Sequence, residues 1–330
     1  MTVNRNLNWL KWAIPLAVIL LLALFPVATP DIFYLSVGVL LFMYIALGSS
    51  WNIIGGYSGY ISFGHGAFFG VGAYVVALLL IKLGYSPFFT CIVGGLVAAL
   101  FALIVGYPVL RLKGPYFSIA TLCLGLAVPV IVNNLPSTVT GGGQGLFLPL
   151  MKIDIFFSRT IYYEVMLFLA VGTTLLARWI LNTKFGLGLN AIRENENTAE
   201  TIGVNSTALK LQAYVLSAFL VGVIGGIYAY YRTYVHTATV FDPNLSIAIV
   251  MMAIFGGSAT WQGPVIGAII LTVIDQVLIS AFPGAPAEIS RLIYGLILVL
   301  VIMFMPAGIM HFINTRLRQA RQSKTANEVT

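Results

Sequence analysis

The chain has 330 residues, of which 59% are hydrophobic and only 8% are charged, and its formal net charge is +7. This composition excludes an ordinary soluble domain, in which about 25% of residues are charged. The basic residues are scattered between apolar segments, so membrane orientation explains them better than nucleic-acid binding does. We therefore expect an all-α, polytopic transmembrane helical bundle, because helices satisfy their own backbone groups within lipid.

Apolar segments divide the chain into about ten candidate membrane spans. The eighth is short, and the first follows Arg5 and Lys11, a start that also resembles a secretory signal. A retained first helix is favoured, because the second span begins almost at once near Ile32. In chain order the spans are expected near residues 12–28, 32–53, 67–83, 88–110, 116–135, 161–181, 209–231, 245–255, 265–282 and 289–305. Residues 1–330 should thus form a single transmembrane domain.

The distribution of positive charge predicts the orientation of this domain. A cytoplasmic N-terminus places the loops near 111–115, 182–208 and 256–264 and the tail 306–330 inside, and the loop near 136–160 outside. Twelve Lys and Arg residues then lie inside or at the inner boundary, against five outside. This asymmetry agrees with the positive-inside rule, so both termini are expected in the cytoplasm.

A glycine-rich break separates the second and third spans. Glycine at this density bends or interrupts a helix, and interrupted helices can line the substrate site of a transporter. The alternative is close helix packing through small residues. His65 could bind a substrate carboxylate, form hydrogen bonds within the bundle or lie at the interface. The candidate pathway residues of this break are Gly55, Gly56, Ser58, Ser62, Gly64, His65 and Gly66.

A second glycine-rich break lies at residues 255–264 and contains Gly256 and Gly257. Its Gly-Pro pair argues against a continuous helix, so the segment is either a tight loop or a re-entrant turn. Asp275 lies within the ninth apolar segment. Because a buried carboxylate is costly in a membrane, Asp275 should face the bundle or water, and we add these three residues to the candidate pathway.

The hydrophilic loop between the sixth and seventh spans contains four charges in the eleven residues from Arg193 to Gly203. Glu196, Ala199, Glu200 and Gly203 have the spacing of one face of a short helix, which Asn190 could cap and Gly203 could end. Such a helix would offer acidic and small residues to a soluble docking partner. The alternative is a solvated charged loop.

The chain lacks sequence signatures of catalysis and of nucleotide binding. There is no HExxH, no CxxC and no glycine-rich loop followed by Gly-Lys-Ser/Thr, so any ATP must be hydrolysed by another subunit. Cys91 and Cys123 lie in apolar runs, as packing residues do. Three scattered histidines argue against a metal site, and we expect neither a metal nor an enzymatic activity.

Several ordered blocks of this sequence resemble the branched-chain amino acid ABC permeases of the LivM type. The run from Ala191 to Gly203, Ala-Ile-Arg-Glu-Asn-Glu-Asn-Thr-Ala-Glu-Thr-Ile-Gly, and the span after it resemble the cytoplasmic loop and following span of that family. Further matching blocks are Gly55 to Tyr74, Leu110 to Leu124, Thr140 to Leu146 and Met305 to Gly308. Together these blocks cover most of the chain.

The resemblance implies a multi-pass permease subunit of a type II ABC importer in the bacterial inner (plasma) membrane. The implied substrate is a branched-chain or other hydrophobic amino acid. The implied partners are a second related permease subunit, two cytoplasmic ATPase subunits and a periplasmic substrate-binding protein, besides the lipid bilayer. ATP and Mg²⁺ would be bound by the ATPase subunits and not by this chain.

The resemblance also implies roles for particular residues. The inner loop would dock into the ATPase as the coupling element, although the alanine expected directly after Glu196 is absent here. The two glycine breaks would line the translocation path. The implied coupling residues are Arg193, Glu194, Glu196, Ala199, Glu200 and Gly203, and the implied binding-protein contacts are Thr140, Gly141, Gly142, Gly143 and Gln144.

Three other functions compete with this interpretation. Related permeases that import urea or short amides share the architecture. A self-sufficient, ion-coupled amino acid carrier would need an ion site within the bundle, for which only Asp275 and His65 are candidates. A membrane enzyme would require clustered polar residues at one interface, where this sequence has glycine-rich loops instead.

Overall fold

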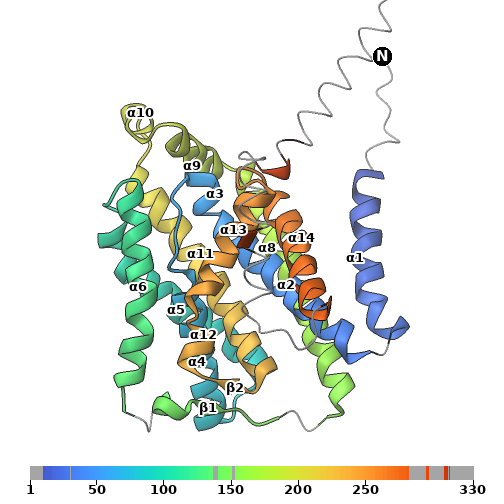
Figure 1. The fold of residues 1–330 in the computed structure, drawn as a ribbon. Coiled ribbons are helices and arrows are strands. Elements are labelled where there is room, and N and C mark those ends of the chain that lie inside the picture. The colour runs from blue at the N-terminus through green and yellow to red at the C-terminus, as the bar shows by residue number, and fades with distance from the viewer. Residues whose placement is uncertain are drawn as a thin grey trace, which may run out of the picture.

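Long α-helices make up most of the structure (Figure 1), a computed structural model that describes residues 10–29, 31–136, 140–150, 153–281, 295–296, 308–310 and 312. Within these ranges, seven helical segments are long and apolar enough to cross a membrane, and Pro15–Ala28 and Gly263–Leu278 are shorter apolar helices. The expected span at 289–305 and most of the tail 306–330 lie outside the described residues. The chain is therefore a multi-pass helical membrane protein.

The helices follow one another with short connections. The transmembrane-length elements and the shorter helices and strands between them are α1 (Leu10–Ala28), α2 (Ile32–Asn52), α3 (Gly55–Ser58), α4 (His65–Leu83), α5 (Pro87–Val109), α6 (Pro115–Asn134), η2 (Gly142–Gln144), β1 (Leu146–Phe147), α8 (Ile155–Leu181), α9 (Lys184–Glu194), α10 (Glu196–Thr201), α11 (Ser206–Arg232), β2 (Tyr234–Val235), α12 (Thr237–Val240), α13 (Pro243–Gly256) and α14 (Gly263–Ala281).

Most of these helices begin and end within three residues of the expected spans. The exception is α8, which begins at Ile155 and not near 161, so the expected loop at 136–160 ends at Asp154. The Asp154 side chain accepts a hydrogen bond from the Phe156 backbone N–H at 3.0 Å and caps the helix. Arg159 can lie inside α8 because its guanidinium stacks on the Tyr231 ring, 4.4 Å from the centroid.

The bundle is not purely helical, because β1 and β2 form a small antiparallel pair with Leu146 opposite Val235. These strands are not predictable from the sequence, since two residues carry no periodicity. Thr140, Gly141 and Gln144, which were predicted to contact a binding protein, immediately precede β1. The Gln144 carbonyl accepts a hydrogen bond from the Tyr234 hydroxyl at 3.0 Å.

Small residues allow the central helices to approach closely. α11 is the most buried of the candidate spans. A Cβ added at Gly72 of α4 would lie 2.1 Å from the carbonyl oxygen of Gly222 in α11, and one added at Gly225 would lie 2.2 Å from that of Phe69. Such contacts are typical of helix pairs in membranes, where backbones pack through glycine.

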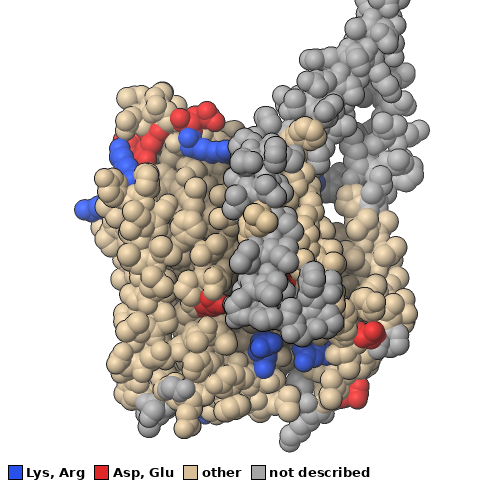
Figure 2. Space-filling view, in the orientation of Figure 1, with Lys and Arg blue, Asp and Glu red and all other residues tan. Residues whose placement is uncertain are grey.

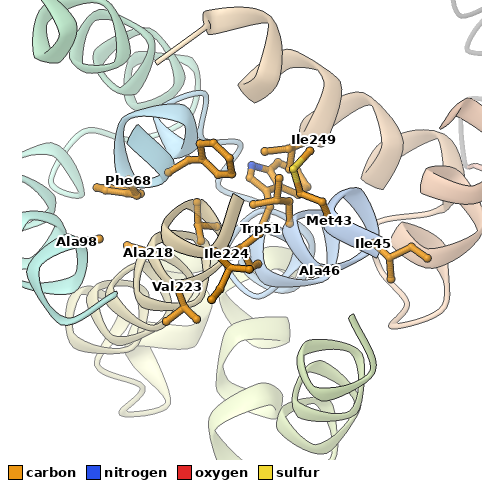
Figure 3. Packing of buried hydrophobic residues seen from close by; sticks show 14 of the residues in the cluster. Met43, Ile45, Ala46, Trp51, Phe68, Ala98, Ala218, Val223, Ile224 and Ile249 are labelled. Atoms are coloured by element: carbon orange, nitrogen blue, oxygen red, sulfur yellow. The ribbon is translucent and has the colours of Figure 1, made fainter. Parts of the chain in front are cut away.

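Large apolar side chains fill the space on the other side of α11. Trp51 and Met43 of α2 lie near Ile249 of α13, and Ile224 of α11 lies close by (Figure 3). Trp51 is fully buried, and its indole N–H donates to the carbonyl oxygen of Ser62 at 2.8 Å. The core therefore also holds the extended chain of the first glycine break.

The loops gather at two opposite ends of the bundle (Figure 1). One end, the α9–α10 end, carries α3, α9, α10 and the turn 257–262. The other, the β1–β2 end, carries the strands and the start of α8. Charged residues lie mainly towards the two ends of the face in Figure 2, with a broad band of other residues between them, as expected for a protein surrounded by lipid.

Candidate functional site

The predicted coupling element forms two short helices, α9 and α10. Thr183 caps α9, and the Asn195 side chain caps α10 by accepting from the Thr198 backbone N–H at 3.0 Å. The prediction that Asn190 caps this helix was wrong, because Asn190 lies inside α9 and the chain bends at Asn195. Two caps in thirteen residues fix the path of the loop.

Gly203 ends α10, as predicted. Its φ of 89° lies in the left-handed region, where glycine is favoured. The Gly203 backbone N–H donates to the Glu200 carbonyl, and the Val204 N–H donates to the Ala199 carbonyl, both at 3.0 Å. This pair of bonds is a Schellman motif, which turns the chain sharply towards α11.

A buried ion pair fastens α10 to the bundle. Lys210 Nζ of α11 lies 2.6 Å from Glu196 Oε1, and the side chains are only 2% and 14% exposed. The Tyr60 hydroxyl donates to the other carboxylate oxygen of Glu196 and accepts from Lys210 Nζ at 3.0 Å. The Lys210 ammonium also lies 4.2 Å from the centroid of the Tyr60 ring. We call Glu196, Lys210 and Tyr60 the ionic joint.

The ionic joint keeps Glu196 charged. Burial raises the pKa of its carboxyl, but hydrogen bonds from Lys210 and Tyr60 and the positive charges of Lys210 and Lys113 outweigh burial, so the pKa lies below its usual value. For Tyr60, burial and then the neighbouring Glu196 raise the pKa of the phenol. Tyr60 is thus a neutral donor and Glu196 an anionic acceptor at neutral pH.

The predicted coupling residues divide between two faces of α9 and α10. Ala199 is 2% exposed, and with Glu196 it faces the bundle, which differs from the expectation that both face a partner. The chain bends at Asn195, so these two residues lie on the inner face of α10. Arg193, Glu194 and Glu200 are exposed.

The outer face of this element also carries apolar groups that the sequence analysis did not single out. Ile202, directly after α10, is 72% exposed, and Leu187 in α9 is 63% exposed. Together with the exposed charged residues, they give this end of the bundle an amphipathic outer surface. The role of the element in docking stays a prediction.

The first glycine break is an extended segment along the bundle, in which Tyr60, Ser62 and Gly64 are buried and Ile61 is exposed. Gly59, with φ of 77°, ends α3, and the chain then runs without helix to Gly64. Side chains satisfy its backbone: Ser118 Oγ donates to the Ile61 carbonyl at 2.7 Å, and the Phe63 N–H donates to Thr121 Oγ1 at 3.1 Å. Non-helical backbone is tolerated at membrane depth only when it is enclosed in this way.

His65 at the start of α4 is fully buried and held by two serines. Its Nδ1 lies 3.2 Å from Ser62 Oγ, and its Nε2 lies 3.1 Å from Ser217 Oγ of α11. The Tyr214 ring packs edge-on against the imidazole at 6.0 Å. Of the three roles considered from sequence, hydrogen bonding within the bundle is the one that this geometry supports.

The two glycine breaks pack against each other at the α9–α10 end. A Cβ added at Gly56 would lie 2.1 Å from the Ser258 carbonyl oxygen, and Asn52 Nδ2 donates to the Thr260 carbonyl at 3.0 Å. The second break is a tight turn, residues 257–262, in which Gly257 has φ of 112°. The chain enters it directly from α13 and leaves it into α14, so the break is a short connection between two apolar helices.

Asp275 is separate from both breaks and lines a cavity of about 630 Å³ between α2, α11, α13 and α14. Asp242, Asn244 and Thr272 line the same cavity. The other predicted pathway residues are not among its lining residues. Ser58 and Gly66, for example, form hydrogen bonds within the bundle. Ser58 Oγ donates to the Ile54 carbonyl, and the Gly66 N–H donates to Ser246 Oγ.

Several residues of these sites escaped the sequence analysis. Lys210 was counted only as a boundary charge, although a lysine in the first turns of an apolar span signals a buried partner. Tyr60 has no polar pattern around it that could indicate its role. Asp242 was not singled out, and its position directly before the Pro243-Asn pair is a capping signal. Thr272 is one hydroxyl in an apolar span and carries no signal.

Within the described residues, no group of three or more His, Cys, Asp or Glu side chains is arranged to bind a metal ion. Cys91 is buried and Cys123 is exposed, and neither is in a disulfide.

Comparison with known proteins gives a consistent relationship. The High-affinity branched-chain amino acid transport system permease protein LivM of Escherichia coli K12 is 30% identical over 311 residues, which cover 86% of this chain and 71% of the relative. LivM of Salmonella typhimurium is 30% identical over 304 residues, covering 84% and 69%. The Probable branched-chain amino acid transport permease protein LivH of Methanocaldococcus jannaschii is 28% identical over 254 residues, covering 73% and 78%.

No solved structure gives a significant match to this chain. The profile of the family described as "Branched-chain amino acid transport system / permease component" matches residues 33–302. Because this match spans most of the sequence, including the glycine breaks and the α9–α10 element, the chain belongs to the branched-chain amino acid transport system permease family.

Proposed function

We propose that this chain is the membrane-spanning permease subunit of an ABC importer for branched-chain or other hydrophobic amino acids. Two ATPase subunits hydrolyse ATP, a second, related permease completes the pathway, and a periplasmic binding protein delivers the substrate. The chain itself binds neither ATP nor Mg²⁺ and catalyses no reaction. It belongs to the bacterial inner membrane, has about ten spans and a type II importer-like architecture, and keeps both termini in the cytoplasm.

The observation that carries this proposal is the attachment of the α9–α10 element. An importer must convey movement of the ATPase into the membrane domain, which requires a rigid handle on a packed bundle. α10 is capped at both ends and is joined through Glu196 and Lys210 to the start of α11. The family membership and the relatives' names supply the substrate class.

The outer surface of this element supports docking of a separate subunit. Ile202 and Leu187 are exposed beside Arg193, Glu194 and Glu200. Exposed apolar groups with charged neighbours are typical of protein interfaces. We assign the outward residues to the ATPase contact, and Glu196, Ala199 and Gly203 to holding the element in place.

We assign the segment from Thr140 to Gln144 to the contact with the binding protein. It lies at the β1–β2 end, opposite the α9–α10 element, as an importer with separate ATPase and binding-protein partners requires. Gln144 is exposed there, whereas Thr140 is buried. Of these residues, Gln144 therefore offers the side chain for a contact.

The test is co-expression of this chain with its candidate partner subunits, followed by reconstitution in liposomes and measurement of ATP-dependent leucine uptake. We expect Ile202→Asp to leave the chain in the membrane and to abolish both association with the ATPase and uptake. The matched control is Leu83→Asp, which changes an exposed leucine at the end of α4, at the β1–β2 end.

Normal uptake by the Ile202→Asp variant would contradict the coupling assignment. Uptake by the chain alone, without ATPase subunits and driven by an ion gradient, would replace the proposal with an ion-coupled carrier. Uptake of urea or short amides in place of leucine would assign the same architecture to a different substrate.

A further inference from the structure

A second cavity lies at the β1–β2 end, where three candidate membrane spans begin or end. Its volume is about 560 Å³, and residues from the start of α2, the start of α8 and the end of α11 line it. Ser36, Arg159 and Tyr228 are lining residues, and each lies about one turn from the end of its helix. Because the ends of membrane-spanning helices lie where lipid meets water, this cavity is at the depth of the lipid headgroups.

Two arginines line this second cavity, which we call the arginine cavity. Arg159 belongs to α8, and Arg232 is the last residue of α11. Arg232 is exposed, and Arg159 is partly buried with its guanidinium 4.4 Å from the centroid of the Tyr231 ring. Neither arginine forms an ion pair with a described residue. Like charges that share a cavity repel each other, so an anion bound beside both of them is favourable.

The acidic residues close to the arginines in sequence do not supply that anion. Asp154 accepts from the Phe156 backbone N–H at 3.0 Å and caps α8, and Asp31 caps α2 in the same way at 2.8 Å. Neither of them lines the arginine cavity, nor does Glu164 of α8. Among the described lining residues there is no carboxylate, so the lining has a net positive charge.

Apolar and aromatic side chains form the rest of the arginine cavity. Leu150, Ile153 and Ile155 line it and are 76%, 51% and 68% exposed, so they give it an apolar rim. Tyr228 and Tyr231 also line it, and tyrosine is enriched where a membrane protein meets the headgroup layer. The cavity thus combines two cations with an apolar rim at the surface of the bilayer.

From this arrangement we infer that the arginine cavity binds the headgroup of an anionic phospholipid. The phosphodiester accepts hydrogen bonds from the guanidinium groups of Arg159 and Arg232, and an acyl chain lies against Leu150, Ile153 and Ile155. Because the two arginines belong to different helices, the bound phosphate joins the start of α8 to the end of α11. This inference goes beyond the proposed function and does not depend on it, since it requires only that the chain lies in a membrane.

The net charge of the lining distinguishes this ligand from an amino acid. The ammonium group of an amino acid needs a hydrogen-bond acceptor of opposite charge, whereas the described lining has two cations and no carboxylate. A phosphodiester supplies a full negative charge, and guanidinium groups bind phosphate oxygens through pairs of parallel hydrogen bonds. Free phosphate would supply the charge and leave the apolar rim uncovered. Basic pockets between transmembrane helices are typical sites for anionic lipid headgroups.

The first experiment measures the affinity for lipid. The full-length chain in mild detergent is titrated with phosphatidylglycerol or with phosphatidylcholine, and bound lipid is counted by native mass spectrometry. We expect the Kd of the first phosphatidylglycerol to be about tenfold lower than that of the first phosphatidylcholine. Arg232→Gln should remove this preference. The matched control is Lys82→Gln, which removes an exposed cation in the last turn of α4, outside the cavity, and should keep it. Equal binding of the two lipids, or an unchanged preference in Arg232→Gln, would overturn the inference.

Competitors in the same titration identify the source of the bound anion. Inorganic phosphate and leucine are each added in large excess over phosphatidylglycerol, and neither should displace the first lipid. Displacement by inorganic phosphate would assign the arginine cavity to a free anion, and displacement by leucine would assign it to the transported substrate. Either result would overturn the inference, and the result with leucine would leave the proposed function intact.

The second experiment separates lipid binding from folding. Phosphatidylglycerol at about 100 times its Kd should raise the Tm of the unaltered chain by about 5 °C, because it binds the folded state. Arg232 is the residue to change, since Arg159 also stacks on Tyr231 within the bundle. Without lipid, Arg232→Gln and Lys82→Gln should unfold at the same temperature, and phosphatidylglycerol should raise the Tm of Lys82→Gln alone. An equal rise in both variants would show that the lipid does not bind at the arginine cavity.

Discussion

The two ends of the bundle hold their loops by different means. At the α9–α10 end, Lys210 and Glu196 form a nearly buried ion pair, and Gly56 packs against the backbone of Ser258. At the β1–β2 end, the loop after α6 is fixed by a two-residue strand pair and by the Tyr234 hydroxyl. A displacement at the first end must therefore move the packed interior, whereas the strand region at the second end meets the core through the side chains of Val235 and Leu148.

This difference matches the tasks proposed for the two ends. The extended segment from Gly59 to Gly64 links the α9–α10 end to α4, because Tyr60 belongs to the ionic joint and Ser62 contacts His65 at the start of α4. Because these six residues are extended and contain no helix that could bend, movement of α10 would be transmitted directly to α4. Breaking contacts at each end should thus have unequal effects.

The largest effect is expected at the contact between the two glycine breaks. In Gly56→Ala, the new methyl group would lie 2.1 Å from the Ser258 carbonyl oxygen and 1.9 Å from Asn52 Oδ1. Because Ser258 contributes backbone, the turn 257–262 must shift, at a cost of about 3 kcal/mol of unfolding free energy. The measurement is thermal unfolding of the purified chain in detergent.

Gly172→Ala is the matched control, since Gly172 lies in α8 with nothing within 4 Å of the added Cβ. Alanine is favoured over glycine in a helix by about 1 kcal/mol, so this variant should unfold at an equal or higher temperature. A Gly56→Ala variant as stable as the control would show that the two breaks do not pack as tightly as described.

A smaller loss of stability, with a large loss of transport, is expected for Lys210→Met. The change leaves the Glu196 carboxylate without its cation. We expect the free energy of unfolding to fall by on the order of 2 kcal/mol, and not by more, because the Glu196 side chain is partly exposed to solvent. Uptake should fall by much more than stability, since α10 is released from α11. The measurements are thermal unfolding and ATP-dependent leucine uptake on the same preparation.

Lys113→Met is the control for Lys210→Met, because it removes a positive charge near α10 without breaking the ion pair. Lys113 is exposed and donates to Asn197 Oδ1 of α10 at 3.1 Å. An exposed contact of this kind contributes little, so both stability and uptake should remain near their original values. If Lys113→Met and Lys210→Met reduced uptake equally, the ionic joint would have no special place in coupling.

The spans and the polar contacts differ in how far the sequence predicted them. Long apolar runs bounded by Pro, Gly or Asp define helices locally, so the expected spans agree with α2, α4 and α5 within three residues. α8 began earlier than expected because an Asp cap and an arginine stacked on Tyr231 do not look apolar. Hydropathy alone cannot register either contact.

The candidate site was predicted in part. Gly203 was correctly predicted to end a helix, because a glycine after an acidic, polar run is a local signal. The inward orientation of Glu196 depends on Lys210, fourteen residues away, and on Tyr60 in another loop. The cavity at Asp275 depends on Asp242, which precedes α13, and on Thr272 of α14. Such partners become visible only when the helices are placed in space.

The smallest effect, and one of opposite sign, is expected at the β1–β2 end. Thr233 ends α11 with φ of 57°, a left-handed conformation that β-branched residues rarely adopt. Its backbone carbonyl accepts from the Leu148 N–H at 2.8 Å, a bond that glycine would keep. Thr233→Gly should therefore raise the free energy of unfolding by about 0.5–1 kcal/mol.

The matched control is Thr207→Gly. Thr207 is exposed in the first turn of the same helix, and this change should lower the free energy of unfolding by a similar amount. A gain in thermal stability without loss of uptake would show that the β1–β2 end tolerates local change, as its looser attachment implies; a loss of uptake in Thr233→Gly would instead make the end of α11 part of the moving core.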